Sequence, residues 1–399
     1  MFYYNKIKKM KKTKIIFLIL FLGFFYPFHS FSEIIKQKKT TEENPHLNVF
    51  LDYSSSIDSS IEKETYRGTN FCESNLKLDV MGKVNDKISY HFAKQLLKEK
   101  EDDEWGFLKS EENSKSIIDL AYLKYKWNDK LYFLFGKQPF AFGSMEFNPA
   151  CGEHIYRYPY VQKSNKESSI GFSFIFIPKK DHELQFQVVN GMNKKEDNVN
   201  REINHPIGYS LNWNWNLNND DDDQIMKNRW SYSIFQENEK RRFWKLLALG
   251  SQINCNPVSI EANYIFSDED LEKNGDLTKI LRILNRNYYY YPSVTYGTYS
   301  VKLKYNFIPK WNLIAKGAYE IGTSKKGGFN DILEENKLFK KAYVYYGGIE
   351  FSPIIKNEDL SFYLAYQNQR INYNLDKIKK ENRNDHLIIL GLSYRIKII

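Results

Sequence analysis

The stretch Ile207-Gly-Tyr-Ser-Leu-Asn-Trp-Asn-Trp-Asn-Leu217 alternates apolar and polar residues along its whole length. Because successive side chains of an extended chain point to opposite faces, it predicts a β-strand with one apolar and one polar face. The pattern recurs in about sixteen segments, and no segment supplies helices to cover the apolar faces. Such alternation is typical of strands that have lipid outside and water inside.

The composition supports this interpretation. Of the 399 residues, 16% are aromatic, including 30 Tyr and 7 Trp, which are favoured at membrane–water boundaries. The mean hydropathy is −0.59, too polar for a helical membrane protein. A membrane barrel keeps a low average because its apolar residues alternate with polar ones.

The N-terminus predicts a secretory signal peptide at residues 1–32, followed by a barrel domain at 33–399. Six lysines precede the apolar run 15–28, and Ser30-Phe31-Ser32 offers a small-x-small cleavage site. The run is 14 residues long, short for a membrane-spanning helix, so an uncleaved anchor is the lesser alternative. Cleavage would remove six lysines and no acidic residue, lowering the formal net charge from +9 to +3. A nucleic-acid partner is therefore not expected.

Residues that carry covalent or metal chemistry show no recognisable pattern. The cysteines are Cys72, Cys151 and Cys255; isolated thiols are expected, with a Cys72–Cys151 disulfide between external loops as the alternative. No G-x-S-x-G element, phosphate-binding glycine loop or zinc-type histidine spacing occurs. The acidic run 220–223 is interpreted as a solvated turn. We expect no enzyme activity, no metal and no cofactor.

Strands are expected at 47–53, 73–84, 87–95, 116–126, 130–137, 168–177, 182–190, 206–217, 228–236, 245–254, 258–267, 296–307, 311–320, 341–352, 359–371 and 386–398. Tight connections rich in Asn, Asp or Pro alternate with long polar ones at 54–72, 96–115, 138–167, 191–205, 268–295, 321–340 and 372–385. An eighth long-side connection, at about 237–244, is shorter.

This organisation predicts an all-β fold: a transmembrane antiparallel up-and-down β-barrel of about 16 strands, with short periplasmic turns and long external loops. Closing the barrel gives every backbone N–H and C=O group of the wall a hydrogen-bond partner, which is required where lipid surrounds the strands. A barrel of this size also has a lumen wide enough for water. A soluble β-sandwich or β-helix is the runner-up. The C-terminal amphipathic segment 386–399 resembles the signal read by the barrel-assembly machinery, although it ends in Ile399 rather than an aromatic residue.

Several segments resemble the phosphate-selective porin O and P family. They are Ile88-Ser-Tyr-His-Phe92 after a tight turn, Ala121-Tyr-Leu-Lys124, Gly136-Lys-Gln-Pro-Phe-Ala-Phe-Gly143, and Val189-Asn-Gly191 followed by the Asn-rich run 193–200. The resemblance covers most of the chain after residue 32, in order and spacing. It implies a 16-stranded barrel, a homotrimer in outer-membrane lipid, and a third loop, here 138–167, that folds inward to narrow the pore.

Charge on the inner face is the expected determinant of selectivity, because rings of Lys or Arg favour anions. Alternation places Lys302, Lys304, Lys316 and Arg229 on the inner face. The same parity adds Lys77, Lys83, Arg395 and Lys397, against Asp79, Glu183, Glu261 and Glu320. The alternative is that these are ordinary solvated side chains of a wet lumen.

The constriction candidates lie in and beside the loop 138–167. Lys137 opens this loop, Lys163 and Lys166 close it, and Arg157 stands among tyrosines, where its guanidinium could bind an anion in bidentate fashion. Equally, the tyrosines could simply pack the loop against the wall.

The function expected from these features is an outer-membrane porin, a passive diffusion channel for small hydrophilic solutes with a mild preference for anions, phosphate among them. One alternative is a binding or adhesion barrel that acts through loops 268–295 and 321–340. A less favoured one is a barrel enzyme such as a phospholipase or protease.

Overall fold

The computed structural model describes residues 47–62, 64–72, 76–97, 118–147, 168–190, 207–218, 224–238, 242–273, 275–284, 291–325, 336–353, 360–374 and 382–399. These residues all belong to one compact unit, 43–399. Among them, no helix combines the length and the apolar character needed to cross a bilayer.

The sheet contains 17 strands. In chain order they are β1 (Leu47–Glu62), β2 (Thr65–Cys72), β3 (Leu76–Lys83), β4 (Ile88–Leu97), β5 (Leu120–Asn128), β6 (Leu131–Pro139), β7 (Ser168–Phe176), β8 (His182–Asn190), β9 (Ile207–Asn218), β10 (Gln224–Asn238), β11 (Arg242–Cys255), β12 (Val258–Glu269), β13 (Val294–Ile308), β14 (Trp311–Ser324), β15 (Leu338–Phe351), β16 (Leu360–Tyr373) and β17 (Arg383–Lys397). The helical elements of the described ranges are η1 (Met145–Phe147) and α3 (Asp276–Leu284).

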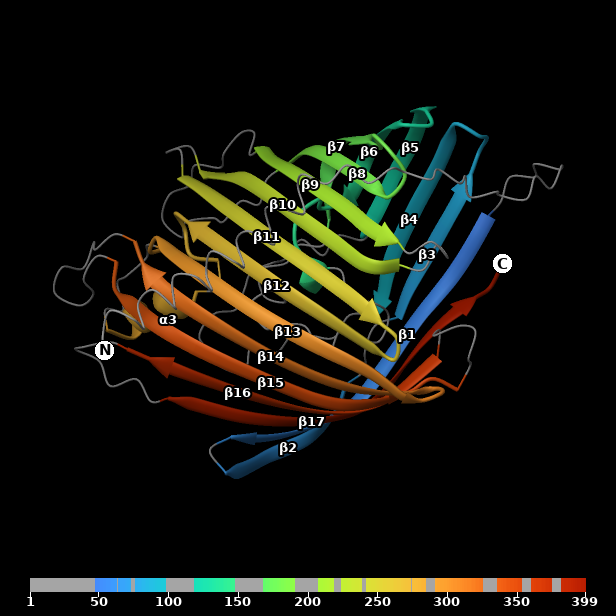
Figure 1. Cartoon of the computed structure of the whole chain (residues 1–399). Helices are drawn as coiled ribbons and strands as arrows, with labels where there is room; N and C mark the ends of the chain where they lie inside the picture. The colour runs from blue at the N-terminus through green and yellow to red at the C-terminus, as the bar shows by residue number, and fades with distance from the viewer. Residues whose placement is uncertain are drawn as a thin grey trace, which may run out of the picture. The chain divides into compact units, whose positions relative to one another are not determined.

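The strands form a closed antiparallel barrel, as the alternation predicted (Figure 1). Closure comes from β1, which pairs with β17 from Phe50↔Lys397 to Glu62↔Asp385. The other edge of β1 pairs with β3 over its first half and with β2 over its second half. Since β2 and β3 are therefore two parts of one wall strand, the 17 strands make a barrel of 16.

The first long connection is the main error in the predicted strand pattern. Residues 54–72 were expected to form a loop, but β1 continues to Glu62, and β2 returns alongside it from Thr65. Backbone pairing runs through this hairpin, with a register shift at Ser60/Ile61. Serine and aspartate in 54–60 favoured a loop in the sequence; ladder hydrogen bonds to β17 and β2 override that preference.

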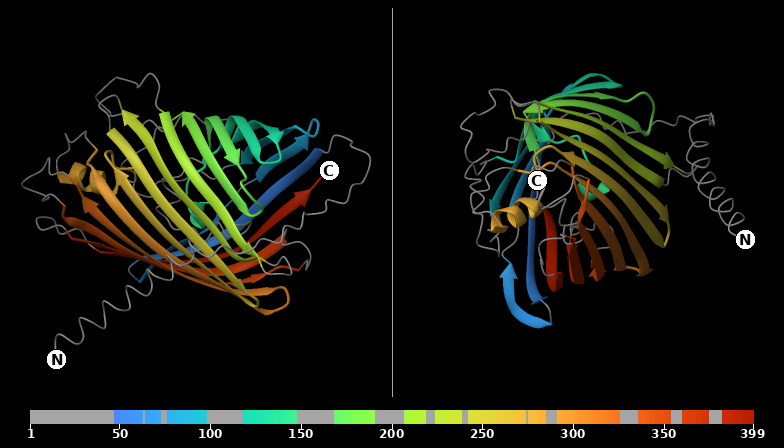
Figure 2. Two further views of the ribbon diagram at one scale, coloured as in Figure 1. Left: turned by 45° about the horizontal axis from the view of Figure 1, so that its top comes forward. Right: turned by 90° about the vertical axis from the view of Figure 1, so that its left-hand side faces the viewer.

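The two faces of the wall are as different as the sequence indicated. On β9, Tyr209 and Leu211 are 48% and 54% exposed, whereas Ser210 and Asn212 are each 1% exposed. Apolar side chains therefore point away from the barrel and polar ones point into it. Figure 2 shows the ring of strands that separates the two faces.

The tight connections close by the expected turn chemistry. The Asn85 side chain accepts hydrogen bonds from the backbone N–H groups of Lys87 (2.9 Å) and Ile88 (2.8 Å). Asn128 does the same for Lys130 at 2.9 Å. Asparagine supplies a side-chain acceptor that mimics the backbone, which fixes the register of the hairpins β3–β4 and β5–β6.

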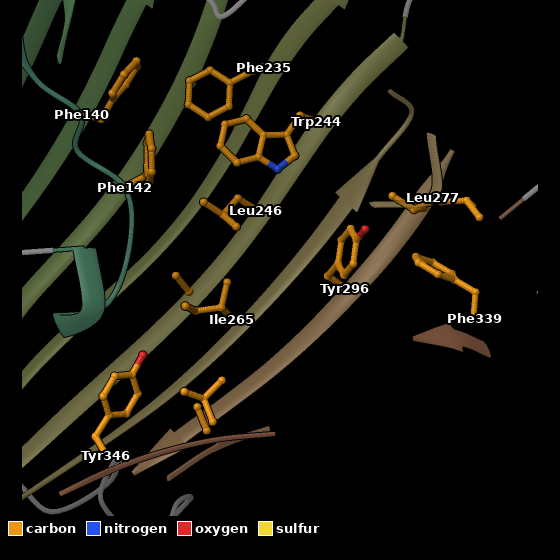
Figure 3. Close-up of a cluster of buried hydrophobic side chains, with 14 of the residues drawn as sticks. Phe140, Phe142, Phe235, Trp244, Leu246, Ile265, Leu277, Tyr296, Phe339 and Tyr346 are labelled. Carbon is orange, nitrogen blue, oxygen red and sulfur yellow. The ribbon is translucent and has the colours of Figure 1, made fainter. Parts of the chain in front are cut away.

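The inner face is not uniformly polar, contrary to expectation. A cluster of buried apolar side chains lies inside the barrel on β10 to β17 (Figure 3). It includes Phe235, Trp244 and Tyr296, which sit at inward-facing positions of their strands. Helix α3 covers part of this cluster through Leu277, Ile280 and Leu281. The connection 268–295, expected to be a polar external loop, thus contains a helix packed against the inner wall.

Candidate functional site

A short segment after β6 lies inside the barrel and is the candidate functional site. It comprises residues 140–147, which we call the inserted segment, and includes η1. Near the end of β6, just before this segment, Gln138 is fully buried and accepts a hydrogen bond from Ser173 at 2.6 Å. Residues 140–146 are all buried. Gly143 has φ +104°, a conformation that glycine adopts without the steric cost a Cβ would add.

Backbone groups of the inserted segment bond to inward side chains of strands far along the chain. The Ala141 N–H donates to the Gln187 side chain on β8 at 2.8 Å, and the Gly143 N–H to Ser231 on β10 at 2.7 Å. The Met145 N–H donates to Asn263 on β12 at 3.1 Å. Polar residues of the inner face therefore satisfy backbone donors that burial would otherwise leave unpaired.

Aromatic packing holds the same segment. The Phe142 ring lies 5.6 Å from Phe235 and 5.8 Å from Trp244, with edge-to-face geometry at both contacts. Phe140 lies 5.7 Å from Phe235 in the same arrangement. Figure 3 shows both rings of the segment turned toward Phe235 and Trp244. Aromatic pairs at these separations are favourable beyond the area they bury.

A buried ion pair fixes the far end of the inserted segment. The Glu146 carboxylate lies 2.5 Å from the Lys316 ammonium on β14, and both side chains are 2% exposed. Glu146 also accepts a hydrogen bond from Ser300 on β13 at 2.6 Å. On the other side, Arg229 donates to the Phe142 carbonyl at 3.2 Å. Two of the predicted pore residues, Lys316 and Arg229, thus contact the segment directly.

The segment approaches the wall closely at Gly250 on β11. A Cβ there would lie 2.7 Å from the Met145 nitrogen and 2.9 Å from the Ser144 Cβ. Such contacts are too short for any larger residue without displacement of the segment. Glycine at this inward position therefore lets the two backbones meet.

The inner face on the opposite side of the barrel is more open. Inner side chains of β6 to β15 are mostly buried, whereas the inward side chains of Lys77, Ser89 and Lys124 on β3, β4 and β5 are intermediate in burial. A charged network lies on this side: Arg395 donates to Asp52 at 3.2 Å and to Asp79 at 3.1 Å. The inserted segment therefore leaves an accessible polar surface on the wall of β1 to β5 and β17.

A second buried polar network anchors α3. Glu272 accepts hydrogen bonds from the backbone N–H groups of Leu277 and Thr278, both at 2.7 Å, and from the Tyr296 hydroxyl at 2.8 Å. A carboxylate at a helix N-terminus satisfies free N–H groups and interacts favourably with the helix dipole. Lys340 contacts Asp276 of α3 at 2.5 Å and Glu320 of β14 at 2.8 Å.

At the rim of the barrel beside α3, Lys325 forms ion pairs with Asp268 and Asp270, and we call these three residues the rim clip. Burial alone would raise the pKa of Asp270, but the Phe243 N–H and the Lys325 ammonium together hold it below its ordinary value. Burial alone would lower the pKa of Lys325, but the two aspartates raise it. Both groups are thus stabilised in their charged forms.

The other predicted lysines divide into two groups. Lys302 and Lys304 point inward and pair with carboxylates of the wall, Glu261 at 2.8 Å and Glu350 at 3.5 Å. Lys137 shares the outward face of β6 with Phe135, and its ammonium donates to the Ile118 carbonyl. Strand β6 continues to Pro139, two residues beyond its predicted end, and its alternation turns Gln138 rather than Lys137 inward. Arg157, Lys163 and Lys166 lie outside the described residues, as does Cys151.

The inner face also carries acids that the sequence analysis did not assign. They include Asp52, Asp58, Glu269, Glu350 and Asp385, to which the inserted segment adds Glu146. Their inward positions follow from pairing register and were available from strand parity. Together with the four acids already assigned, these acids outnumber the eight basic residues predicted to face inward, so these positions do not give the expected excess of positive charge.

A closed barrel with an apolar outer face, a segment folded into its bore and an accessible polar inner wall defines a channel of the outer-membrane porin class. The model of the family described as phosphate-selective porin O and P matches residues 60–396. The chain therefore belongs to this family of porins and is located in the outer membrane.

Solved structures of outer-membrane barrels share the fold. The outer-membrane channel DcaP of Acinetobacter baumannii has a TM-score of 0.58 at 10% identity, covering 88% of this chain and 97% of that chain. OmpT of Vibrio cholerae in its trimer form has a TM-score of 0.55 at 10% sequence identity, covering 89% of this chain and 100% of that chain. An anion-selective porin from Comamonas acidovorans has a TM-score of 0.54 at 7% sequence identity, covering 88% of this chain and 100% of that chain. No curated protein sequence matches the chain.

Proposed function

We propose that the protein is a passive diffusion channel for small hydrophilic solutes, with a mild preference for anions, phosphate among them. The observation that supports it best is the inserted segment, held inside the barrel by side chains of β8 to β14 while the wall of β1 to β5 remains accessible. A bore narrowed on one side and wet on the other passes small solutes and excludes large ones. The rest of the loop 138–167, with Arg157, Lys163 and Lys166, would complete the constriction.

The mild anion preference is attributed to the inner-face cations Lys302, Lys304, Lys316 and Arg229. Inner-face cations lower the cost of anion entry. Since Lys302 and Lys304 are ion-paired with wall carboxylates, much of their field is neutralised, which keeps the preference weak. One structural neighbour is described as anion-selective, which agrees with this direction.

Assembly and export follow from the same proposal. Residues 1–32 would act as a cleaved signal peptide, and the C-terminal strand would be read by the barrel-assembly machinery. The apolar outer face would contact outer-membrane lipid. A homotrimer is proposed from the family, and OmpT of Vibrio cholerae, one structural neighbour, is described in a trimer form.

Conductance across a planar bilayer tests the channel, and the absence of any ion-permeable pore in purified, folded protein would overturn it. Reversal potentials in a salt gradient test selectivity: a Lys302→Gln/Lys304→Gln variant should shift toward cations. Lys245→Gln, the loss of one positive charge at an outward position of β11, should leave the reversal potential unchanged. An unshifted double variant would remove the basis for assigning selectivity to these lysines.

Two further assays separate the alternatives. Solute uptake in liposome swelling distinguishes a porin from an adhesion barrel, which would bind ligand without admitting solute. A lipid-hydrolysis assay should detect no activity, because we propose a channel without enzymatic chemistry; turnover of phospholipid would contradict this.

A further inference from the structure

A polar cavity lies on the inner face where β16, β17, β1 and β2 meet, near the end of the barrel that carries the long connections. Its volume is about 260 Å³, many times the roughly 30 Å³ that one water occupies in the liquid. Its polar lining includes Asp58, Asn70, Gln367, Gln369, Arg383 and Asp385. The size suits a small solute rather than a single ordered water.

Strand register brings these side chains to one place. Asp58 of β1 pairs with Asn70 of β2 on one side and with Ile389 of β17 on the other. Gln369 of β16 pairs with Asp385 of β17. Residues that pair across antiparallel strands share a face, so four strands contribute to one inner surface.

Two ion pairs lie in the cavity, and the carboxylate of Asp58 belongs to neither of them. Arg67 contacts Glu62 at 3.0 Å, and Arg383 contacts Asp385. The Asp58 Oδ1 atom is buried without a hydrogen-bond partner. A buried acceptor left without a partner costs about 1–3 kcal/mol, and more when it is charged. A ligand that donates a hydrogen bond to this oxygen would remove that cost.

Amide groups surround this carboxylate. Asn70, Gln367 and Gln369 line the same cavity, and within the described ranges no side-chain hydrogen bond or ion pair is found for any of them. Each amide offers two donors and an acceptor, and the carboxylate offers acceptors only. Leu387 adds an apolar surface to the lining.

We infer that this cavity is a binding subsite for a small neutral hydroxyl-rich solute of the size of a monosaccharide. Hydroxyl groups both donate and accept, so they match amides, and two neighbouring hydroxyls can donate to the oxygens of Asp58. The C–H face of a sugar ring would lie against Leu387. A phosphate ion is disfavoured, because Asp58 has no cation paired with it in the described part of the chain.

This inference rests on the proposed channel only in that solute arrives through the bore. The test uses glucose, added at each side of a single channel in a planar bilayer. We expect a saturable reduction of ion current in the wild-type protein. Asp58→Ala should raise the half-saturating glucose concentration about tenfold to a hundredfold, since a hydrogen bond to a charged group contributes about 1.5–3 kcal/mol. Gln369→Leu should raise it as well.

Asn216→Leu is the matched control, an inward polar-to-apolar change on β9, on another part of the wall. It should leave the glucose effect unchanged. A normal pore on which glucose has no saturable effect overturns the subsite. An equal effect of Asn216→Leu does so too, as does methylammonium acting as strongly as glucose, because a lone cation would then account for the site.

If the wild-type protein forms no pore, the proposed function fails and the subsite is decided separately. Saturation-transfer NMR on detergent-solubilised protein should then show transfer to glucose that is reduced in Asp58→Ala but kept in Asn216→Leu. Equal transfer in all three proteins, or none in the wild type, overturns the subsite.

Discussion

Replacing Lys316 by methionine tests how the inserted segment is held. The change leaves Glu146 charged, 2% exposed and without its ammonium partner at 2.5 Å. Removing one member of a buried ion pair costs about 3–5 kcal/mol. The backbone hydrogen bonds from the segment to Gln187, Ser231 and Asn263 together contribute about 3 kcal/mol at roughly 1 kcal/mol each. Glu146 regains hydration if the segment leaves the wall. The substitution should therefore destabilise the attachment of the segment and not the pairing of the barrel strands.

A cost of about 4 kcal/mol shifts the attached–detached equilibrium by about a thousandfold. Single-channel conductance should therefore rise in Lys316→Met, while the barrel stays folded. Lys304→Met is the control, because the Lys304–Glu350 pair at 3.5 Å joins two wall strands and not the segment. The double variant Glu146→Gln/Lys316→Met also removes the charge of the buried carboxylate and should return conductance toward the wild-type value. Equal conductance in Lys316→Met and Lys304→Met would refute the reasoning.

Three further predictions concern the same surroundings. Gly250→Val should also raise conductance, because its side chain would meet the Met145 nitrogen and the Ser144 Cβ at under 3 Å; an unchanged pore would show that the segment does not pack there. Phe142→Ala should destabilise the segment by about 3–5 kcal/mol, seen as faster amide exchange of Gly143, whose N–H is bonded to Ser231; unaltered exchange contradicts it. The rim clip should protect amides near Phe243 between about pH 4 and pH 10. Asp270, with its pKa held below the ordinary 3.8, loses its contribution only as pH falls through that lowered value. Lys325, with its pKa raised above 10.5, loses its contribution only as pH rises through the raised value. Asp270→Asn should abolish the acid limb of the profile, and a limb that persists would assign it to another group.

The wall of the barrel could be predicted from the sequence because period-two alternation is a local property. Ile207–Leu217 fixes its own faces, and Asn85 and Asn128 make turns with backbone groups two or three residues away. These signals need no knowledge of distant partners. The hairpin β1–β2 was missed because its pairing partners, β17 above all, lie at the opposite end of the chain.

The contents of the bore could not be predicted in the same way. Glu146 accepts a hydrogen bond from Ser300, which lies 154 residues away in the sequence. No spacing of residues in the sequence predicts such a contact. Two signals were nevertheless present. Apart from Lys245, the run 243–250 is apolar on both faces, which is typical of a strand covered on both sides. The spacing of Leu277, Ile280 and Leu281 indicates a helix with one apolar face.

Cysteine accessibility tests the central claim, a water-filled bore that the inserted segment narrows on one side. Single cysteines would be placed at Lys77, Ser231 and Leu211 in a variant with the native cysteines replaced by serine. A water-soluble thiol reagent should react at position 77 and reduce the current stepwise. Position 231, beneath the segment, should be protected, and position 211, on the outer face, should react only with a lipid-soluble reagent. Reaction at 231 as fast as at 77, or a current change from labelling at 211 by the water-soluble reagent, would contradict the account.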